Sequence, residues 1–183
     1  VLKKCLCIKP QYSEVTNLLL KHIKENKYPL IDSYPLRLYK KRNCCFRLSK
    51  SSQYVTILSD TYTKTKDDIV KILKSYLSKT EYKISVNHND VDVYNVYSSY
   101  TIKIIDNKTN EEFNIAKIIF NKNECFSINE KDGFVTGSID TNLYFLYVEY
   151  IKNKIYLNKT QEANENLYYI NQYEDYIKKT IKN

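Results

Sequence analysis

Asp90 and Asp92, in the stretch NHNDVDVY, have a spacing that could hold a metal ion. Side chains two residues apart on a strand point to the same face, so His88 would share that face with both carboxylates. Clustered carboxylates hold the divalent ions that phosphoryl and nucleotidyl transfer use. The alternative is a junction between a loop and a strand, with both acids facing water while Val91 and Val93 face the core. We favour this alternative, and therefore assign no metal ligand and keep the two aspartates only as candidates.

Cys44 and Cys45 are candidates for a nucleophile, because Lys41, Arg42 and Arg47 lie beside them in the sequence. Neighbouring positive charge lowers the pKa of a thiol and makes it more reactive. No histidine lies nearby in the sequence to act as a base, and one cysteine of the pair would be buried if the segment is a strand. We therefore interpret both cysteines as structural, and we expect no catalytic residue and no cofactor.

Basic and aromatic residues gather between positions 39 and 47. Lysine and arginine neutralise phosphates, and an aromatic ring can stack on an unpaired base. This segment could therefore contact RNA or another polyanion, although basic residues at the tip of a hairpin are also an ordinary solvated turn. The candidate nucleic-acid-binding residues are Tyr39, Lys40, Lys41, Arg42, Phe46 and Arg47.

The C-terminal part of the chain is rich in tyrosine, with more of these residues than one pair of helices normally buries. Some of them should therefore be exposed. Such a surface is more often a protein interface than a platform for RNA. The candidate interface residues are Tyr144, Tyr147, Tyr150 and Tyr173, and the expected partner is another protein or a second copy of this chain.

The composition indicates one folded domain with a basic surface. The 183 residues are 43% hydrophobic, which is enough for a core, while two Gly and three Pro leave no Gly-rich phosphate loop. A net charge of +8 and a pI near 9.0 suit a polyanion such as RNA, DNA or an anionic membrane. The alternative is compositional drift, because AT-rich codons favour Lys, Asn, Ile and Tyr. The absence of methionine suggests a fragment or a processed chain.

The cysteines favour a reducing compartment. Their number, five, is odd and includes an adjacent pair, which argues against a disulfide framework. No C-x-x-C spacing occurs and both histidines are isolated, so a zinc site is not favoured. The chain lacks an apolar run of about 18 residues, and its first residues lack the apolar centre of a secretory signal. We expect a cytoplasmic protein that does not bind membranes.

Hydrophobic periodicity predicts the elements of the first half of the chain. Its best-defined helix would be capped by Asp67 or Asp68 and would carry apolar residues at helical spacing as far as Leu77. The expected elements are a strand over 1–9, a helix over 13–24, a hairpin over 35–48, a strand over 54–58 and a helix over 67–77.

In the second half the period changes to two and then returns to that of a helix. One mixed, mostly antiparallel sheet covered by helices is the economical packing of all these elements. We therefore predict an α+β fold in a single domain over residues 1–183, with a helical C-terminal part from about residue 138. The expected elements are strands over 82–86, 90–97, 100–106, 112–120, 124–128 and 134–137, followed by helices over 138–153 and 161–181.

In the order of its elements, the region 45–155 resembles the nucleotidyltransferase-fold poly(A) polymerases of poxviruses and related large DNA viruses. YVTILSDTYTKTKDDIVKILKSYL (54–77) is similar to a strand–helix step whose strand bears an acidic pair in that family. YTIKIIDNKTNEEFNIAKIIF (100–120) is similar to the later antiparallel strands, one of which carries a third acid. FVTGSIDTNLYFLYVEYIKN (134–153) is similar to the strand–helix that closes the core.

This chain departs from the family's pattern at the positions of the acids. Val55, Thr56 and Ile57 stand where the family has its acidic pair, and the third acid would fall near Asn114 and Ala116. The Gly-Ser element that precedes the acidic pair in the family is absent. The resemblance therefore implies a degenerate copy of the fold, and no catalytic residue can be carried over. Such copies serve packing, dimer contacts or RNA guidance.

Our leading hypothesis is a non-catalytic, nucleotidyltransferase-like structural or RNA-contacting domain of a viral-type polymerase assembly. Two alternatives stay open. One is a protein-interaction subunit that uses the tyrosine-rich helical surface. The other is a metal-dependent nucleotidyl or phosphoryl transferase that uses Asp90 and Asp92.

Overall fold

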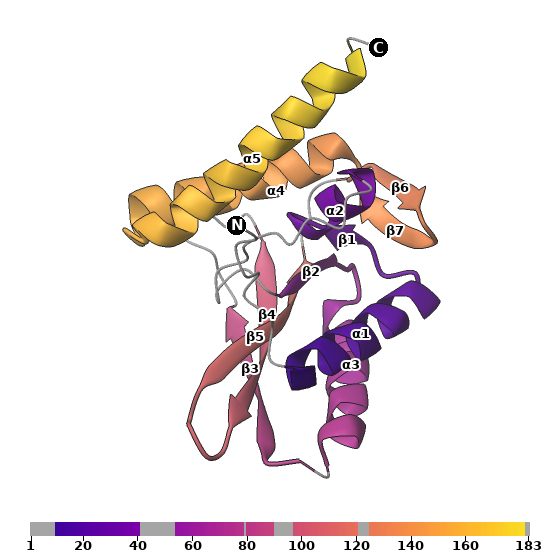
Figure 1. Cartoon of the computed structure of the whole chain (residues 1–183), viewed down its shortest axis with the longest axis vertical. Helices are drawn as coiled ribbons and strands as arrows, with labels where there is room; N and C mark the ends of the chain where they lie inside the picture. Colours follow the sequence, from indigo (N-terminus) through magenta and orange to yellow (C-terminus); the bar gives the residue numbers. More distant parts are fainter. Residues whose placement is uncertain (1–9, 41–53, 79, 90–96, 121–124, 182–183) are drawn as a thin grey trace, which may run out of the picture. The chain divides into compact units, whose positions relative to one another are not determined.

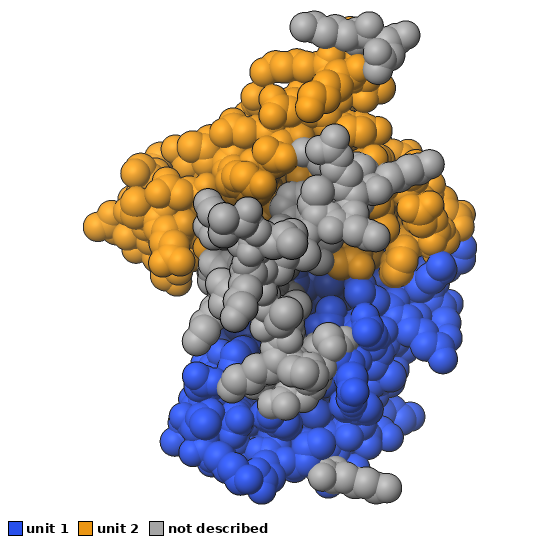
Figure 2. Space-filling view, viewed as in Figure 1, with its two compact units in different colours: residues 1–28, 44–124 blue, residues 29–43, 125–183 orange. Residues whose placement is uncertain are grey.

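The structure, a computed structural model, describes residues 10–40, 54–78, 80–89, 97–120 and 125–181. The chain divides into two units, coloured separately in Figure 2: unit 1 is 1–28 and 44–124, and unit 2 is 29–43 and 125–183. The described residues form seven strands, five α-helices and one π-helical turn, with helices at the C-terminal end. The predicted α+β fold is therefore confirmed. A single domain over the whole chain stays a prediction.

Unit 1 contains four strands in the order β3–β4–β5–β2. Strands β3 (Tyr82–Asn89), β4 (Ser98–Asp106) and β5 (Glu112–Phe120) pair antiparallel in sequence order, and β2 (Val55–Leu58) pairs parallel with β5. The β4–β5 turn follows from its residues. Asp106 Oδ1 accepts hydrogen bonds from the backbone N–H groups of Lys108 and Thr109, and Asn110 adopts a left-handed conformation.

Helices α1 (Pro10–Glu25) and α3 (Tyr62–Leu77) lie side by side and cover one face of the unit 1 strands (Figure 1). Ile69, Leu73 and Leu77 of α3 recur every fourth residue and are buried, which is the stripe that the sequence predicts. From α1, Val15, Leu19 and Ile23 are also buried. Unit 1 is therefore a sheet with a helical layer on one face.

Helix α3 begins five residues earlier than predicted, so the assignment of Asp67 or Asp68 as its cap is wrong. The backbone N–H of Thr65 bonds to the carbonyl of Thr61, which starts the helix directly after β2. Asp67 instead forms an ion pair with Lys66, and Asp68 accepts a hydrogen bond from the Tyr28 hydroxyl. A short turn after β2 is enough to begin the helix. Asp67 contacts a neighbour in the same helix, and Asp68 contacts Tyr28, which follows α1.

Unit 2 contains a short parallel pair, β1 (Leu30–Ile31) with β7 (Phe134–Gly137), and an antiparallel pair, β7 with β6 (Ile128–Lys131). Asp132 and Gly133 both have positive φ, as the tight turn between β6 and β7 requires. The predicted strand over 124–128 is wrong for residues 125–127, which lie outside any strand. The carbonyl of Ser127 accepts hydrogen bonds from the start of the following helix instead.

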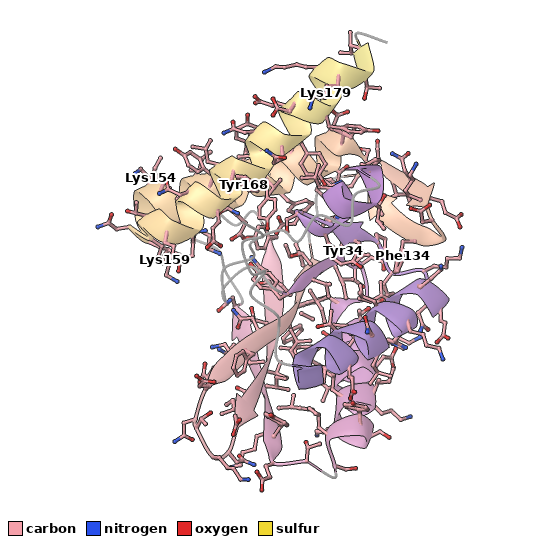
Figure 3. All side chains as sticks on the ribbon, in the orientation of Figure 1. Tyr34, Phe134, Lys154, Lys159, Tyr168 and Lys179 are labelled. Carbon is pink, nitrogen blue, oxygen red and sulfur yellow. The ribbon has the colours of Figure 1, made fainter. Side chains whose placement is uncertain are left out.

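The helices of unit 2 are α2 (Tyr34–Lys40), α4 (Ile139–Ile151) and α5 (Thr160–Ile181), with the π-helical turn η2 (Lys152–Tyr156) between the last two. Helices α4 and α5 form a hairpin (Figure 1). Ser138 caps α4, since its side chain accepts a hydrogen bond from the backbone N–H of Thr141. The ring of Tyr34 in α2 packs edge to face on the ring of Phe134 in β7, with the two ring centroids 6.4 Å apart (Figure 3).

The predicted hairpin over 35–48 is wrong for its first part, because residues 34–40 are helical. Pro35 fits the first turn of a helix, where its missing N–H costs no hydrogen bond. Leu36 is fully buried in this helix. The apolar residues Leu36 and Leu38 are two positions apart, which is the spacing of a strand. The stretch is too short to distinguish the period of a strand from that of a helix. The predicted strand over 1–9, residues 90–96 of the predicted strand over 90–97, and the basic segment over 41–47 lie outside the described residues, and Tyr97 precedes β4.

Candidate nucleic-acid interface

Most of the predicted site residues cannot be placed. Asp90, Asp92, Cys44, Cys45, Lys41, Arg42, Phe46 and Arg47 lie outside the described residues, as does the side chain of Lys40. Tyr39 is described, and it is half-buried in unit 2. Its hydroxyl donates to the carbonyl of Gly137 at 3.3 Å, and its ring lies 5.7 Å from that of Tyr176. Tyr39 therefore helps to pack α2 within unit 2.

Unit 1 carries a group of residues that we name the aromatic–lysine cluster: Tyr62, Lys66, His88, Tyr100 and Phe120. The ring of Tyr62 stacks on Phe120 with centroids 4.8 Å apart, and on Tyr100 at 5.0 Å. The ring of His88 stacks on Tyr100 at 4.2 Å. The ammonium of Lys66 lies 5.3 Å from the centre of the Tyr100 ring, within the range of a cation–π interaction.

The strand register brings this cluster together. His88 of β3 lies directly across from Tyr100 of β4, and Tyr100 lies across from Ile118, two residues before Phe120 on β5. Side chains at paired positions share one face of a sheet, so these rings gather on the face that α3 covers. Tyr62 starts α3, and Lys66 follows one helical turn later. His88 is exposed and the other three rings are half-buried, which leaves the cluster open to solvent at its edge.

Helix α3 also carries exposed positive charge on the side that faces away from the sheet. Lys64, Lys71 and Lys74 are exposed at positions seven and then three residues apart, which places them on one side of the helix. At the β2–α3 junction the hydroxyls of Ser59 and Thr65 lie 2.9 Å apart, and Ser59 Oγ accepts a hydrogen bond from the backbone N–H of Thr61. With Lys66, this end of unit 1 offers aromatic rings and an ammonium group together.

The opposite face of the same strands contains a buried lysine. Lys117 of β5 is only 7% exposed and lies between Thr56 of β2 and Thr101 of β4 in the register. Its ammonium lies 3.1 Å from the hydroxyl of Tyr97 and 5.1 Å from the centre of that ring. A lysine side chain thus occupies the middle of these strands.

The net positive charge is concentrated in unit 1. Its two stretches contain 18 Lys and Arg against 12 Asp and Glu residues, a formal charge of +6, while unit 2 has 11 against 9, or +2. Within the ranges that the structure describes, no group of three or more His, Cys, Asp or Glu residues could hold a metal ion. The same ranges contain no helix with the length and apolar character to cross a membrane.

A polar network joins α1 to the start of α3. The hydroxyl of Tyr28 donates to Asp68 Oδ2 at 3.1 Å, and the ring of His22 packs edge to face on Tyr28. Burial lowers the pKa of His22, and the nearby carboxylates of Asp68 and Glu25 oppose this effect. Burial, together with the hydrogen bond to Asp68, raises the pKa of Tyr28. The network fixes the N-terminal part of α3, which carries Tyr62 and Lys66.

The tyrosines predicted at an interface have different environments in unit 2. Tyr147 is 43% exposed and donates a hydrogen bond to Glu174, whereas Tyr144 and Tyr150 are half-buried. Tyr173 is fully buried, and its hydroxyl donates to the carbonyl of Asp32 at 2.9 Å. Tyr173 therefore belongs to the core of unit 2, and its assignment to an exposed surface needs correction. The helical period alone does not show which tyrosines face α2.

Sequence reasoning missed the aromatic–lysine cluster. Its residues come from four elements and lie up to 58 positions apart in the sequence, from Tyr62 to Phe120. A signal was nevertheless present, because His88, Tyr100 and Phe120 all lie near the ends of predicted strands. The order of those strands in the sheet, which brings the three ends together, was not given by the sequence.

Comparisons with known proteins identify no family. No family model matches the chain, and no curated protein matches it. Among solved structures, "Crystal structure of JHP933 from Helicobacter pylori" is similar to this chain, with a TM-score of 0.43 and 12% sequence identity. The match covers 82% of this chain and 69% of that one.

Proposed function

We propose that this chain is a non-catalytic, nucleotidyltransferase-like module that contacts single-stranded RNA through unit 1. The observation that carries the proposal is the aromatic–lysine cluster, which lies in the unit that holds most of the positive charge. The resemblance to viral poly(A) polymerases supports a place for the module in a polymerase assembly, where a degenerate copy of the fold would guide RNA.

The chemistry of the cluster suits an unpaired nucleotide. Stacking of a base on an aromatic side chain contributes about 1–3 kcal/mol and tolerates any sequence. His88 is the exposed member of the stack and its ring lies 4.2 Å from that of Tyr100, so we place the base beside these two rings. The net positive charge of unit 1 would attract the phosphates that follow, with the release of bound counterions.

Lys117 supports the non-catalytic part of the proposal. Transfer of a nucleotidyl group needs divalent ions held by carboxylates. Lys117 pairs with Thr56 in the strand register, and Thr56 lies on the strand that resembles the one bearing the acidic pair in the poly(A) polymerases. A lysine and a threonine at this level supply no carboxylate to hold a divalent ion.

Binding is tested by the fluorescence anisotropy of a labelled oligouridylate of about 12 nucleotides, a length within the range that single-strand-binding folds occupy. The double variant His88→Ala/Tyr100→Leu should weaken binding about 10-fold or more, because it removes stacking worth about 1–3 kcal/mol. Thermal unfolding followed by circular dichroism checks that the variant is folded. Tyr168→Ala, at a tyrosine of unit 2 that is 49% exposed, is the matched control and should bind as the wild type does.

Equal loss of affinity in the double variant and in the control would overturn the assignment to unit 1. An unchanged affinity in the double variant would remove the cluster from the proposal. The non-catalytic part is tested separately, with an oligoadenylate primer, ATP and either Mg²⁺ or Mn²⁺. We expect no extension of the primer, and extension above the level of a boiled sample would contradict this part.

A further inference from the structure

Lys66 is the lysine of the aromatic–lysine cluster, and its side chain contacts both a ring and a carboxylate. Its ammonium lies 5.3 Å from the centre of the Tyr100 ring and 2.6 Å from Asp67 Oδ1. The side chain of Lys66 is 21% exposed, whereas that of Asp67 is 64% exposed. The lysine therefore lies against the cluster, while the carboxylate that pairs with it extends into solvent.

A nucleotide stacked beside His88 and Tyr100 would bring a phosphate within reach of this ammonium. The ribose alone separates a base from its phosphate, so a base beside the Tyr100 ring keeps its phosphate near that ring. The ammonium of Lys66 already lies 5.3 Å from the same ring, at the end of a flexible side chain. The lysines that α3 exposes face away from the sheet. Among the lysines of α3, Lys66 is thus the one placed to meet that phosphate.

Asp67 would compete with the phosphate for the same ammonium. Carboxylate and phosphate oxygens both accept charge-assisted hydrogen bonds from lysine, so the two anions bind Lys66 by the same chemistry. An ion pair between side chains near the surface is weak, because water screens the charges and holding both side chains in place costs entropy. The pair between Lys66 and Asp67 can therefore open when a phosphate arrives, at a small cost in affinity.

We propose that Lys66 binds the phosphate of the nucleotide that stacks at the aromatic–lysine cluster, and that Asp67 restrains binding by occupying Lys66 in the free chain. Both roles rest on the proposed binding of RNA by unit 1, and they name the residue that contacts the backbone and the residue that weakens the contact. Binding exchanges one ion pair for another, and the carboxylate of Asp67 is released to solvent.

The salt dependence of binding to the labelled oligouridylate tests the contact of Lys66 with phosphate. Lys66→Met keeps an unbranched side chain against Tyr100 and removes the charge. The slope of log affinity against log salt concentration should become shallower by about 0.7, the contribution of one phosphate contact in a single strand. A purely structural role for Lys66 would leave this slope unchanged. Lys71→Met, at an exposed lysine on the other side of the same helix, is the matched control and should keep the wild-type slope.

A double-mutant cycle tests the competition by Asp67. Asp67→Asn should tighten binding about 2- to 5-fold, because it removes an ion pair of the weak, solvent-exposed kind. Asp60→Asn removes the charge of another exposed carboxylate at the β2–α3 junction, and so controls for the general loss of negative charge. In a chain that carries Lys66→Met, the gain from Asp67→Asn should fall to that from Asp60→Asn.

The outcomes separate this proposal from the function on which it rests. An unchanged slope in Lys66→Met, an equal change of slope in Lys71→Met, or a gain from Asp67→Asn that persists without Lys66 would overturn the proposal and leave RNA binding by the cluster in place. Failure of the proposed function has a different signature, namely an unchanged affinity in His88→Ala/Tyr100→Leu. Circular dichroism checks that each variant is folded.

Discussion

The two units of this chain use the same residue types for different purposes. Unit 1 stacks Tyr62, Tyr100 and His88 at the open edge of a helix-covered sheet and holds most of the positive charge. Unit 2 uses Tyr39 and Tyr173 to pack its helices, and exposes aliphatic residues on a nearly neutral hairpin. The comparison indicates that a count of tyrosines says little, whereas their environments separate rings stacked at the edge of a sheet from rings that pack helices.

The units also differ in how they stabilise a buried polar group. In unit 1 the ammonium of Lys117 meets the hydroxyl and the ring of Tyr97. In unit 2 the hydroxyl of Tyr173 meets the carbonyl of Asp32, and burial raises the pKa of Tyr173 well above its ordinary value. Each buried group has a hydrogen-bond partner, as an interior polar atom requires.

The largest effect that we expect comes from Tyr173, the anchor of α5 in unit 2. Tyr173→Ala should lower the free energy of unfolding by about 3–5 kcal/mol, because it leaves a large cavity in the core. Tyr173→Phe keeps the ring and loses one hydrogen bond, so it should cost about 0.5–1.5 kcal/mol. Urea denaturation followed by circular dichroism measures both. If Tyr173→Ala lost less unfolding free energy than Tyr173→Phe, the ring of Tyr173 would not be what packs α5.

A smaller change in unfolding free energy should distinguish the N-terminal caps of α4 and α3, the two helices that directly follow strands β7 and β2. Ser138 caps α4 through its side chain, whereas Thr61 makes no side-chain cap bond at α3. Ser138→Ala should therefore cost about 0.5–2 kcal/mol of unfolding free energy, and Thr61→Ala only a few tenths. Urea denaturation of the two variants gives the comparison directly. Equal costs would contradict the difference between the two helix starts.

The smallest effect concerns pH and unit 1. Burial lowers the pKa of His22 in the folded chain below the ordinary value of 6.5, so between these two values the unfolded chain binds the proton more readily. The contribution of His22 to stability is therefore complete above pH 6.5 and is lost as the pH falls through the lowered pKa. His22→Gln cannot titrate and should show a flatter decline of unfolding free energy on acidification. An identical slope in the variant would contradict the lowered pKa.

Periodicity in the sequence predicts the elements that bury a regular stripe. Strands β2, β4 and β5 and helices α1, α4 and α5 lie within a few residues of their expected positions, because each is long enough or apolar enough for its period to be clear. Helix α2 was mistaken for a strand, because seven residues do not distinguish the two periods. Helix α3 began early, because the turn at Ser59 starts it without the predicted cap.

The candidate site was less predictable than the fold, since it depends on tertiary placement. The proximity of His88 and Tyr100 follows from the register between β3 and β4, and their contact with Tyr62 follows from the packing of α3 on that face. Neither relation is local in the sequence. Similarly, the burial of Tyr173 depends on α2, an element that sequence reasoning assigned to another structure.

Hydrogen–deuterium exchange of the full chain, with and without a saturating oligouridylate, tests the central claim most directly. The claim is that unit 1 contacts RNA and that the helical hairpin of unit 2 does not. We predict that RNA slows exchange at the ends of β3 and β4 that carry His88 and Tyr100, and at the start of α3, while α4 and α5 are unchanged. Protection confined to α4 and α5, or no protection in unit 1 under conditions where anisotropy reports binding, would contradict the claim.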